Sequence, residues 1–446
     1  MGAAMQDSAT TGGRPWRQAA LWLACLAPFF YLSYGFANHL AAQRADVGSV
    51  VFEWERHVPF VAWTIVPYWS INLFYGLSLF LCRTRDELHA HGRRLLTAQL
   101  VAVSCFLLFP LGFTFTRPPT DGIPGLFFTA LTSFDKPFNQ APSLHIALLI
   151  VLWDLYRRLL PRGWHWLLHA WSWLIAISVL TTYQHHFIDI PTGALLGLFC
   201  LWLWPLEGPS PLRGMGWTSD ARRRRLALRY ALGAAAFFAL AAMLGGIALW
   251  LCWPGVALAL VTLNYALFDA AGFQKDAQGR LSFAARWLLL PYRIGAWINA
   301  RLWTRREAPA VRIAAGVLLG RMPTTREARR LGVTHVVDLS AELSAPRDVT
   351  VHAVPMLDLI APAADRLHAA ADAIEAQRQA AGDEGAVLVC CALGYSRSAA
   401  AAAAWLLHTG RSERVDEAIE RLRRERPNLV LHDAHRTALA TLALRA

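Results

Sequence analysis

Uninterrupted apolar stretches of about twenty residues constrain this chain more than any other feature. A helix needs roughly 20 apolar residues to cross the hydrocarbon core of a bilayer, and 55% of the 446 residues are hydrophobic while only 17% are charged. The sequence therefore predicts a multi-pass α-helical membrane domain of eight transmembrane helices. The last two spans are joined only by a short turn at residues 251–255 and could instead form a tight hairpin. The spans lie near residues 18–38, 59–82, 95–115, 142–160, 165–183, 187–206, 227–250 and 253–270.

Basic residues flank alternate apolar runs. Arginine and lysine accumulate on cytoplasmic loops, so this pattern predicts an integral membrane protein with both termini in the cytoplasm. The first run has no convincing small-residue cleavage site before Tyr31 and is expected to remain as a helix. The net charge of +12 does not indicate a nucleic-acid partner, because the arginines gather at the ends of apolar runs. The basic loops contain residues 14–17, 83–94, 157–162 and 213–225.

Composition changes after the last apolar run. We expect a transmembrane domain over residues 1–270, an amphipathic interfacial linker over 271–308 and a cytoplasmic α/β domain over 309–446. The seven cysteines show neither a disulfide framework nor zinc-ligand spacing. In the last domain, strands are predicted at residues 335–339, 349–354 and 386–390, and helices at 363–379 and 398–408.

The segment CALGYSRS, residues 391–398, follows an apolar strand and precedes an alanine-rich helix. A loop whose backbone N–H groups converge at a helix N-terminus binds anions and lowers the pKa of a thiol at its base. Cys391 is therefore a candidate nucleophile. Arg397 supplies a planar fork of donors for two phosphate oxygens, and Gly394 allows a tight turn around the ligand.

This segment resembles the cysteine-dependent protein tyrosine phosphatase superfamily, most closely its dual-specificity branch, over residues 309–446. The resemblance implies a phosphocysteine intermediate on Cys391, phosphate binding by Arg397 and a hydroxyl at Ser398 that helps the thiolate to leave. It also implies that Asp358, in VPMLDLIAP, is the general acid.

The resemblance has one departure and leaves the substrate open. Cys390 replaces the usual histidine before the nucleophile, and it is either a small buried strand residue or a thiol that reacts with oxidised Cys391. A phospholipid or polyol phosphate is the favoured substrate, narrowly ahead of a phosphoprotein, because a basic aromatic linker holds the domain near lipid.

Two histidine motifs, PSLH at residues 142–145 and QHHFID at 184–189, lie at helix ends that the charge pattern places on the extracytoplasmic face. His185 and Asp189 are four residues apart, so on one helix they share a face and the carboxylate can orient the imidazole. Such an imidazole can attack phosphorus. His145 lies on the same membrane face and could supply the general acid.

These motifs resemble the type 2 phosphatidic acid phosphatase superfamily, particularly the branch of inositol phosphorylceramide synthases, over residues 50–206. The resemblance implies that His185 is the nucleophile, Asp189 its partner and His145 the proton donor. Ser143 and Arg117, in TRPP, would bind phosphate. In this pattern, Pro110 and Val179 replace an expected lysine and arginine, and His186 is a less favoured alternative nucleophile.

Together, the motifs predict a bifunctional membrane phosphatase with an extracytoplasmic phosphohistidine site and a cytoplasmic phosphocysteine site. Neither site is expected to need a metal or another cofactor. Two alternatives stay open for the membrane half: a phosphotransferase that uses an alcohol acceptor, and a lipid sensor without turnover. The resemblance implies a bacterial inner membrane, and the sequence leaves the oligomeric state undetermined.

Overall fold

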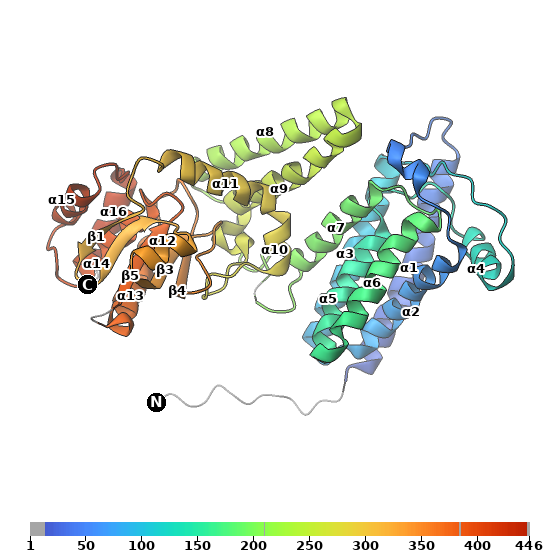
Figure 1. The fold of residues 1–446 in the computed structure, drawn as a ribbon, viewed down its shortest axis with the longest axis horizontal. Coiled ribbons are helices and arrows are strands. Elements are labelled where there is room, and N and C mark those ends of the chain that lie inside the picture. The colour runs from blue at the N-terminus through green and yellow to red at the C-terminus, as the bar shows by residue number, and fades with distance from the viewer. Residues whose placement is uncertain (1–13, 209, 383–384, 444–446) are drawn as a thin grey trace. The chain divides into compact units, whose positions relative to one another are not determined.

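The computed structural model describes residues 14–208, 210–382 and 385–443 (Figure 1). The chain divides between Ser210 and Pro211 into an N-terminal unit and a C-terminal unit. The sequence-based boundary at residue 270 lies further along the chain, so the apolar segment 211–270 clusters with the C-terminal unit.

The N-terminal unit is a helical bundle in which α5 packs on α7, α1 on α3 and α2 on α6. Small residues bring α5 and α7 close together: a Cβ at Gly193 would lie only 2.4 Å from the Ser143 carbonyl oxygen. Such close approach is typical of packing between apolar helices. The helices are α1 (Trp16–Ala42), α2 (Ile65–Leu81), α3 (Arg85–Leu108), α4 (Gly122–Thr132), α5 (Leu144–Leu159), α6 (His165–Thr181) and α7 (Asp189–Leu203).

Within the described residues, four helical stretches are long and apolar enough to cross a membrane: Trp16–Ala42, Ala62–Leu81, Ala221–Leu244 and Gly246–Phe273. The predicted number of eight is not confirmed. Helices α5, α6 and α7 have 16, 17 and 15 residues. At a rise of about 1.5 Å per residue they fall short of a hydrocarbon core of roughly 30 Å. Helix α3 begins with charged residues.

The C-terminal unit contains a five-stranded sheet in the order β1-β2-β5-β3-β4, in which only the β1–β2 pair is antiparallel. Apolar clusters cover both faces, with α13 and α14 contributing to one of them. The predicted α/β domain is therefore confirmed. The strands are β1 (Ala310–Ala314), β2 (Val317–Arg321), β3 (Val333–Ser340), β4 (Thr350–Met356) and β5 (Ala386–Cys391), and the helices are α12 (Thr325–Arg330), α13 (Ala364–Ala381), α14 (Arg397–His408), α15 (Val415–Glu425) and α16 (Asp433–Ala443).

The last two apolar runs form helices α8 (Ala221–Leu244) and α9 (Cys252–Leu263), which pack against each other. The chain turns at Gly245 and Gly246, whose φ angles are 59° and 50°. This backbone conformation favours glycine. The two apolar helices are therefore joined by a tight turn, as in the hairpin alternative, and this turn precedes the residues 251–255 at which it was expected.

The predicted interfacial linker folds into α10 (Phe283–Leu288) and α11 (Leu290–Trp303). Several of its large apolar side chains are exposed: Trp287, Ile294, Trp297, Leu302 and Trp303. Its first residues pack against the sheet. The Lys275 side chain is fully buried, pairs with Asp338 on β3 and donates to the Ser340 carbonyl oxygen at 2.6 Å.

Candidate active sites

Cys391 is the last residue of β5, the central strand of the sheet, and every residue of that strand is buried. The next five residues form a loop, and α14 begins at Arg397. The Cys391 Sγ accepts a hydrogen bond from the Gly394 N–H at 3.3 Å and lies 3.3 Å from the Ser398 Oγ. The loop therefore directs a backbone donor and a hydroxyl at the thiol, which is the arrangement that stabilises a thiolate.

Gly394 shapes this loop. Its φ angle is 80°, and a Cβ built there would lie 2.5 Å from the backbone carbon of Gly320 on β2. Only glycine meets both requirements without strain. The close contact between two glycines lets the loop lie against the sheet.

Arg397 is buried and held in place by acceptors from two other segments. Its Nη1 donates to Glu342 at 2.9 Å and to the Met356 carbonyl oxygen at 3.0 Å, and its Nη2 donates to Glu342 at 2.7 Å. Its Nε has no hydrogen-bond partner among the described residues. A fork–fork pair of this kind fixes the guanidinium plane, so Arg397 is preorganised beside the thiol.

Asp358 follows β4 and lies 3.0 Å from Arg397 Nη2. Burial raises the pKa of Asp358, Arg397 opposes this shift, and the Glu342 carboxylate adds to it, so that the net pKa of Asp358 is raised above the usual aspartate value. A raised pKa suits a general acid, which must carry its proton at the working pH. The backbone of Asp358 is also anchored, because its carbonyl oxygen accepts a hydrogen bond from the Tyr265 hydroxyl at 3.0 Å.

Replacing Asp358 by asparagine is expected to lower kcat for alkyl phosphates about 10²- to 10⁴-fold, because the leaving alkoxide then departs without a proton. In the unsubstituted protein, kcat should fall at high pH as Asp358 deprotonates, and its raised pKa moves this fall above the range of a free aspartate. The pH profile of kcat measures both effects. An aryl phosphate with a good leaving group serves as the control, since it needs less protonation. An unchanged profile for Asp358→Asn would show that another group is the acid.

Cys390 is separated from its neighbour by the pleat of β5. It belongs to the apolar cluster on one face of the sheet, whereas Cys391 belongs to the cluster on the other face. Burial raises the pKa of Cys390 well above the usual thiol value, and the nearby Asp338 carboxylate raises it further. These observations agree with the interpretation of Cys390 as a small buried strand residue, because successive strand side chains point to opposite faces.

Several supporting residues carry no local sequence signal. Glu342 and Tyr265 reach the site from segments far away in the chain. Arg426 joins the loop after Cys391 to the segment just before β1. It donates to the Leu393 carbonyl oxygen at 3.3 Å and pairs with Glu307 at 3.2 Å. Glu307 also accepts a hydrogen bond from the Tyr395 hydroxyl at 2.8 Å. Only their spatial contacts reveal these roles.

An apolar groove leads away from this site. Its lining includes Leu393 and Tyr395 from the loop after Cys391, and also Asp358. Other lining residues come from α8, α9 and α11. Helix α8 and the stretch Gly246–Phe273, which contains α9, are long and apolar enough to cross a membrane. The groove residues from these helices are Tyr230, Phe237, Pro254, Leu258, Pro291, Tyr292, Gly295, Ala296, Asn299 and Trp303.

The N-terminal unit brings the predicted histidine motifs together. His185 Nδ1 lies 3.1 Å from an Asp189 carboxylate oxygen, and its Nε2 lies 3.3 Å from the Ser143 Oγ. The Ser143 N–H donates to the Asp189 carbonyl oxygen at 3.1 Å, which joins the starts of α5 and α7. The carboxylate can therefore fix the tautomer and orientation of the imidazole.

His145 faces the same cavity as His185. The cavity has a volume of 220 Å³, and its lining includes both histidines, Asn72 and Asp135. The His145 ring stacks on Tyr68 with a centroid separation of 4.1 Å, and its Nε2 has no hydrogen-bond partner within the described part of the chain. A nucleophile and a proton donor could thus meet one substrate here.

His186 has a different environment from His185. Its Nδ1 lies 2.9 Å from Glu55, and its Nε2 lies 3.1 Å from the Thr114 hydroxyl. Its ring stacks on Phe113. Because both nitrogens have partners outside the cavity lining, the geometry favours His185 as the nucleophile. Glu55 was not identified from the sequence, because it lies 131 residues away from His186.

The phosphate-binding part of this site is incomplete. Arg117 donates through Nε to the Thr182 carbonyl oxygen at 3.2 Å and lies over the Phe128 ring, and it is not part of the cavity lining. Val179, where an arginine was expected, is fully buried, and its carbonyl oxygen accepts the His185 N–H. Burial raises the pKa of Asp135 to about 6. Sequence reasoning missed this carboxyl, which lines the cavity.

The sheet, the thiol loop and the buried arginine define the C-terminal unit as a cysteine-phosphatase fold with a phosphate-binding loop. Residues 319–443 match the family model "Dual specificity phosphatase, catalytic domain". This part of the chain is accordingly a dual-specificity-type phosphatase domain, and such a domain indicates phosphoric monoester hydrolase activity. The match begins at residue 319, so the resemblance of the N-terminal unit to type 2 phosphatidic acid phosphatases stays a prediction.

Solved structures with similarity to the chain include Tk-PTP in its active form, at 30% identity over 31% of this chain and 98% of that protein, with a TM-score of 0.28. Human DUSP28 has 30% identity, covers 31% of this chain and 97% of its own, and gives a TM-score of 0.28. PTPMT1 in complex with PI(5)P has 22% identity, with coverage of 31% and 96% and a TM-score of 0.27. No curated protein matches the chain.

Proposed function

We propose that the C-terminal unit hydrolyses phosphate monoesters through Cys391. The thiolate attacks phosphorus, a P–S bond forms as the P–O bond to the leaving group breaks, and Asp358 gives its proton to the leaving oxygen. Water then attacks phosphorus and passes a proton to Asp358, and the P–S bond breaks to release phosphate. Ser398 hydrogen-bonds the departing thiolate, while Arg397 and the loop N–H groups stabilise the phosphoryl oxygens.

The observation that carries this proposal is the convergence on one loop of the Cys391 thiol, the Ser398 hydroxyl and the Gly394 N–H, with Arg397 and Asp358 3.0 Å apart beside it. Nucleophile, anion binder and acid are the three parts that phosphoryl transfer to a thiolate needs. Each part is supported by a different element of the fold.

The favoured substrate class is a phospholipid phosphate monoester. The apolar groove supports this choice, because its lining includes Asp358 together with residues of α8 and α9. A phosphate at Cys391 would leave its acyl portion beside apolar side chains. The lining also contains the polar residues Asn299, Glu307 and Asn428, so phosphotyrosine peptides are the comparison substrates in the test below.

Replacing Leu258 in the groove by glutamate is expected to raise KM for a long-chain lipid phosphate about tenfold or more, since burial of a leucine side chain contributes about 1.5–3 kcal/mol. Hydrolysis of p-nitrophenyl phosphate should change little, because this substrate has no acyl chain. Leu232→Glu, on the exposed surface of α8 and outside the groove lining, is the matched control.

The measurement uses the full chain in detergent, with phosphatidylglycerophosphate, phosphatidic acid and phosphotyrosine peptides compared side by side. A strong preference for peptides, or equal effects of the two glutamate variants on the lipid, would overturn the lipid assignment. Loss of p-nitrophenyl phosphate turnover in Leu258→Glu alone would show instead that the groove helix positions Asp358.

We propose a second phosphate-ester activity for the N-terminal unit, supported by the contact of His185 with Asp189 and Ser143 in a cavity shared with His145. His185 Nε2 attacks phosphorus, the P–O bond breaks, and His145 protonates the leaving alcohol. Water then cleaves the P–N bond. The alternatives are transfer to an alcohol acceptor and lipid binding without turnover.

The test offers short-chain phosphatidic acid to Cys391→Ser protein, in which the thiol site is silent. Free phosphate without any added alcohol supports hydrolysis. Product that forms only with an acceptor such as inositol supports transfer. Lipid binding without either product would identify the sensor alternative.

A further inference from the structure

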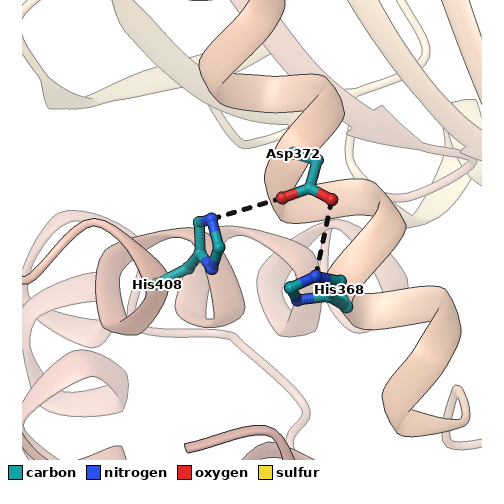
Figure 2. Close-up of side chains that lie close together, drawn as sticks. All are labelled: His368, Asp372 and His408. Atoms are coloured by element: carbon teal, nitrogen blue, oxygen red, sulfur yellow. Dashed lines mark ion pairs between the residues drawn. The ribbon is translucent and has the colours of Figure 1, made fainter. Parts of the chain in front are cut away.

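Three side chains with metal-binding atoms meet on the surface of the phosphatase domain, outside both candidate active sites. His368 and Asp372 lie four residues apart on α13, and His408 is the last residue of α14 (Figure 2). Residues at this spacing on a helix share one face. The third comes from the neighbouring helix, whose packing on α13 brings the three together.

The separations suit a tetrahedral metal ion. His408 Nε2 lies 3.2 Å from one Asp372 oxygen, and His368 Nε2 lies 3.6 Å from the other. One donor atom from each residue lies within 4.8 Å of the other two. Around a zinc ion with bonds of about 2.1 Å, donor atoms are roughly 3.4 Å apart. Small rotations of exposed side chains therefore bring three ligands into position.

Access and charge also favour an ion. The His368 and Asp372 side chains are 54% and 55% exposed, so an ion can enter without opening the fold and water can complete its coordination. His408 lies at the C-terminus of α14, where the helix dipole stabilises a positive charge. Arg411, three residues after His408, stacks on Trp405 and lies 4.0 Å from Glu375.

We propose that His368, Asp372 and His408 bind one divalent transition-metal ion of the zinc class. Two imidazoles and one carboxylate suit zinc, cobalt and nickel better than magnesium, which prefers oxygen ligands. The bound ion links α13 to the end of α14, the helix that begins at the phosphate loop. The site thus has a structural or regulatory character and takes no part in the phosphoryl transfer.

The test uses the full chain in detergent, produced without a histidine tag, stripped with EDTA and carrying Cys391→Ser so that zinc cannot bind the catalytic thiol. In equilibrium dialysis against zinc chloride, this parent protein should bind one more ion per chain than its His408→Ala or Asp372→Asn variant does at the same free zinc concentration. The affinity of that site should fall at least tenfold in both variants. Magnesium chloride should not compete. His352→Ala, an exposed histidine elsewhere on the domain, should bind like the parent.

Equal zinc binding by the parent, His408→Ala and Asp372→Asn would overturn the proposal. The three residues would then form only two histidine–aspartate contacts. Cobalt provides a second readout, because a tetrahedral cobalt site absorbs visible light. The parent and His352→Ala should show this absorption, whereas its persistence in His408→Ala would also count against the site.

Discussion

Cys391→Ser is expected to reduce release of phosphate from p-nitrophenyl phosphate by at least about 10⁴-fold, because a serine hydroxyl in this loop is a far weaker nucleophile than a thiolate. Substrate binding should persist, since Arg397 and the loop N–H groups are retained. The measurement is single-turnover phosphate release together with trapping of the phosphoenzyme. The unsubstituted protein should form an acid-stable phosphothioester, which the variant cannot form.

Cys390→Ser is the matched control for this experiment. Its thiol lies on the opposite face of β5 in the other apolar cluster, so it should retain a phosphocysteine intermediate, with at most a loss of stability. Retention of full turnover in Cys391→Ser would exclude the proposed chemistry. Loss of the intermediate in Cys390→Ser at unchanged folding would show that the two thiols act together.

His185→Ala, tested in the Cys391→Ser background, is expected to remove the remaining turnover of phosphatidic acid to the background level. No other imidazole in the cavity is oriented by a carboxylate, as far as the described residues show. Asp189→Asn should keep the hydrogen-bonded shape but lower kcat strongly, because the amide can stabilise the wrong tautomer. The measurement is free phosphate formed without an added alcohol, together with the product formed only when an alcohol acceptor is present.

His169→Ala provides the control, because His169 is exposed on α6 and contacts Trp153 outside the cavity. Its activity should match the parent. If His185→Ala and His169→Ala behave alike, the N-terminal unit does not use His185 for catalysis. Lipid binding that survives in both would then favour the sensor alternative.

The elements of the phosphatase fold were predictable where a short stretch of sequence determines the structure of that same stretch. Strands β3, β4 and β5 lie within a few residues of their predicted ranges, because each is a short apolar run followed by a turn or helix signal. Strands β1 and β2 were missed. The exposed Arg312 interrupts β1, and β2 ends in Gly320 and Arg321, so neither five-residue run is apolar throughout.

The sites divide in the same way. His185 lies in the loop before α7, which begins at Asp189, and not on the same helix as expected, yet the short spacing still brings the two side chains together. Cys391 and Arg397 flank one loop. Glu342 and Tyr265 reach the thiol site over 55 and 93 residues. Contacts of that kind depend on how the sheet and the hairpin pack, which no local pattern encodes. The prediction of eight spans was not confirmed, because an apolar run in the sequence does not determine how long its helix is. Helices α5, α6 and α7 are shorter than the apolar runs that contain them.

The buried Lys275 shows that a stable, active fragment of this chain must begin before residue 275. A fragment that begins at residue 309 would leave Asp338 buried without its cation, and loss of one partner from a buried ion pair typically costs about 3–5 kcal/mol. The same cut would release the Asp358 backbone from Tyr265. Reconstituted activity should therefore require a polypeptide that starts before Tyr265, well upstream of β1, where the sheet begins.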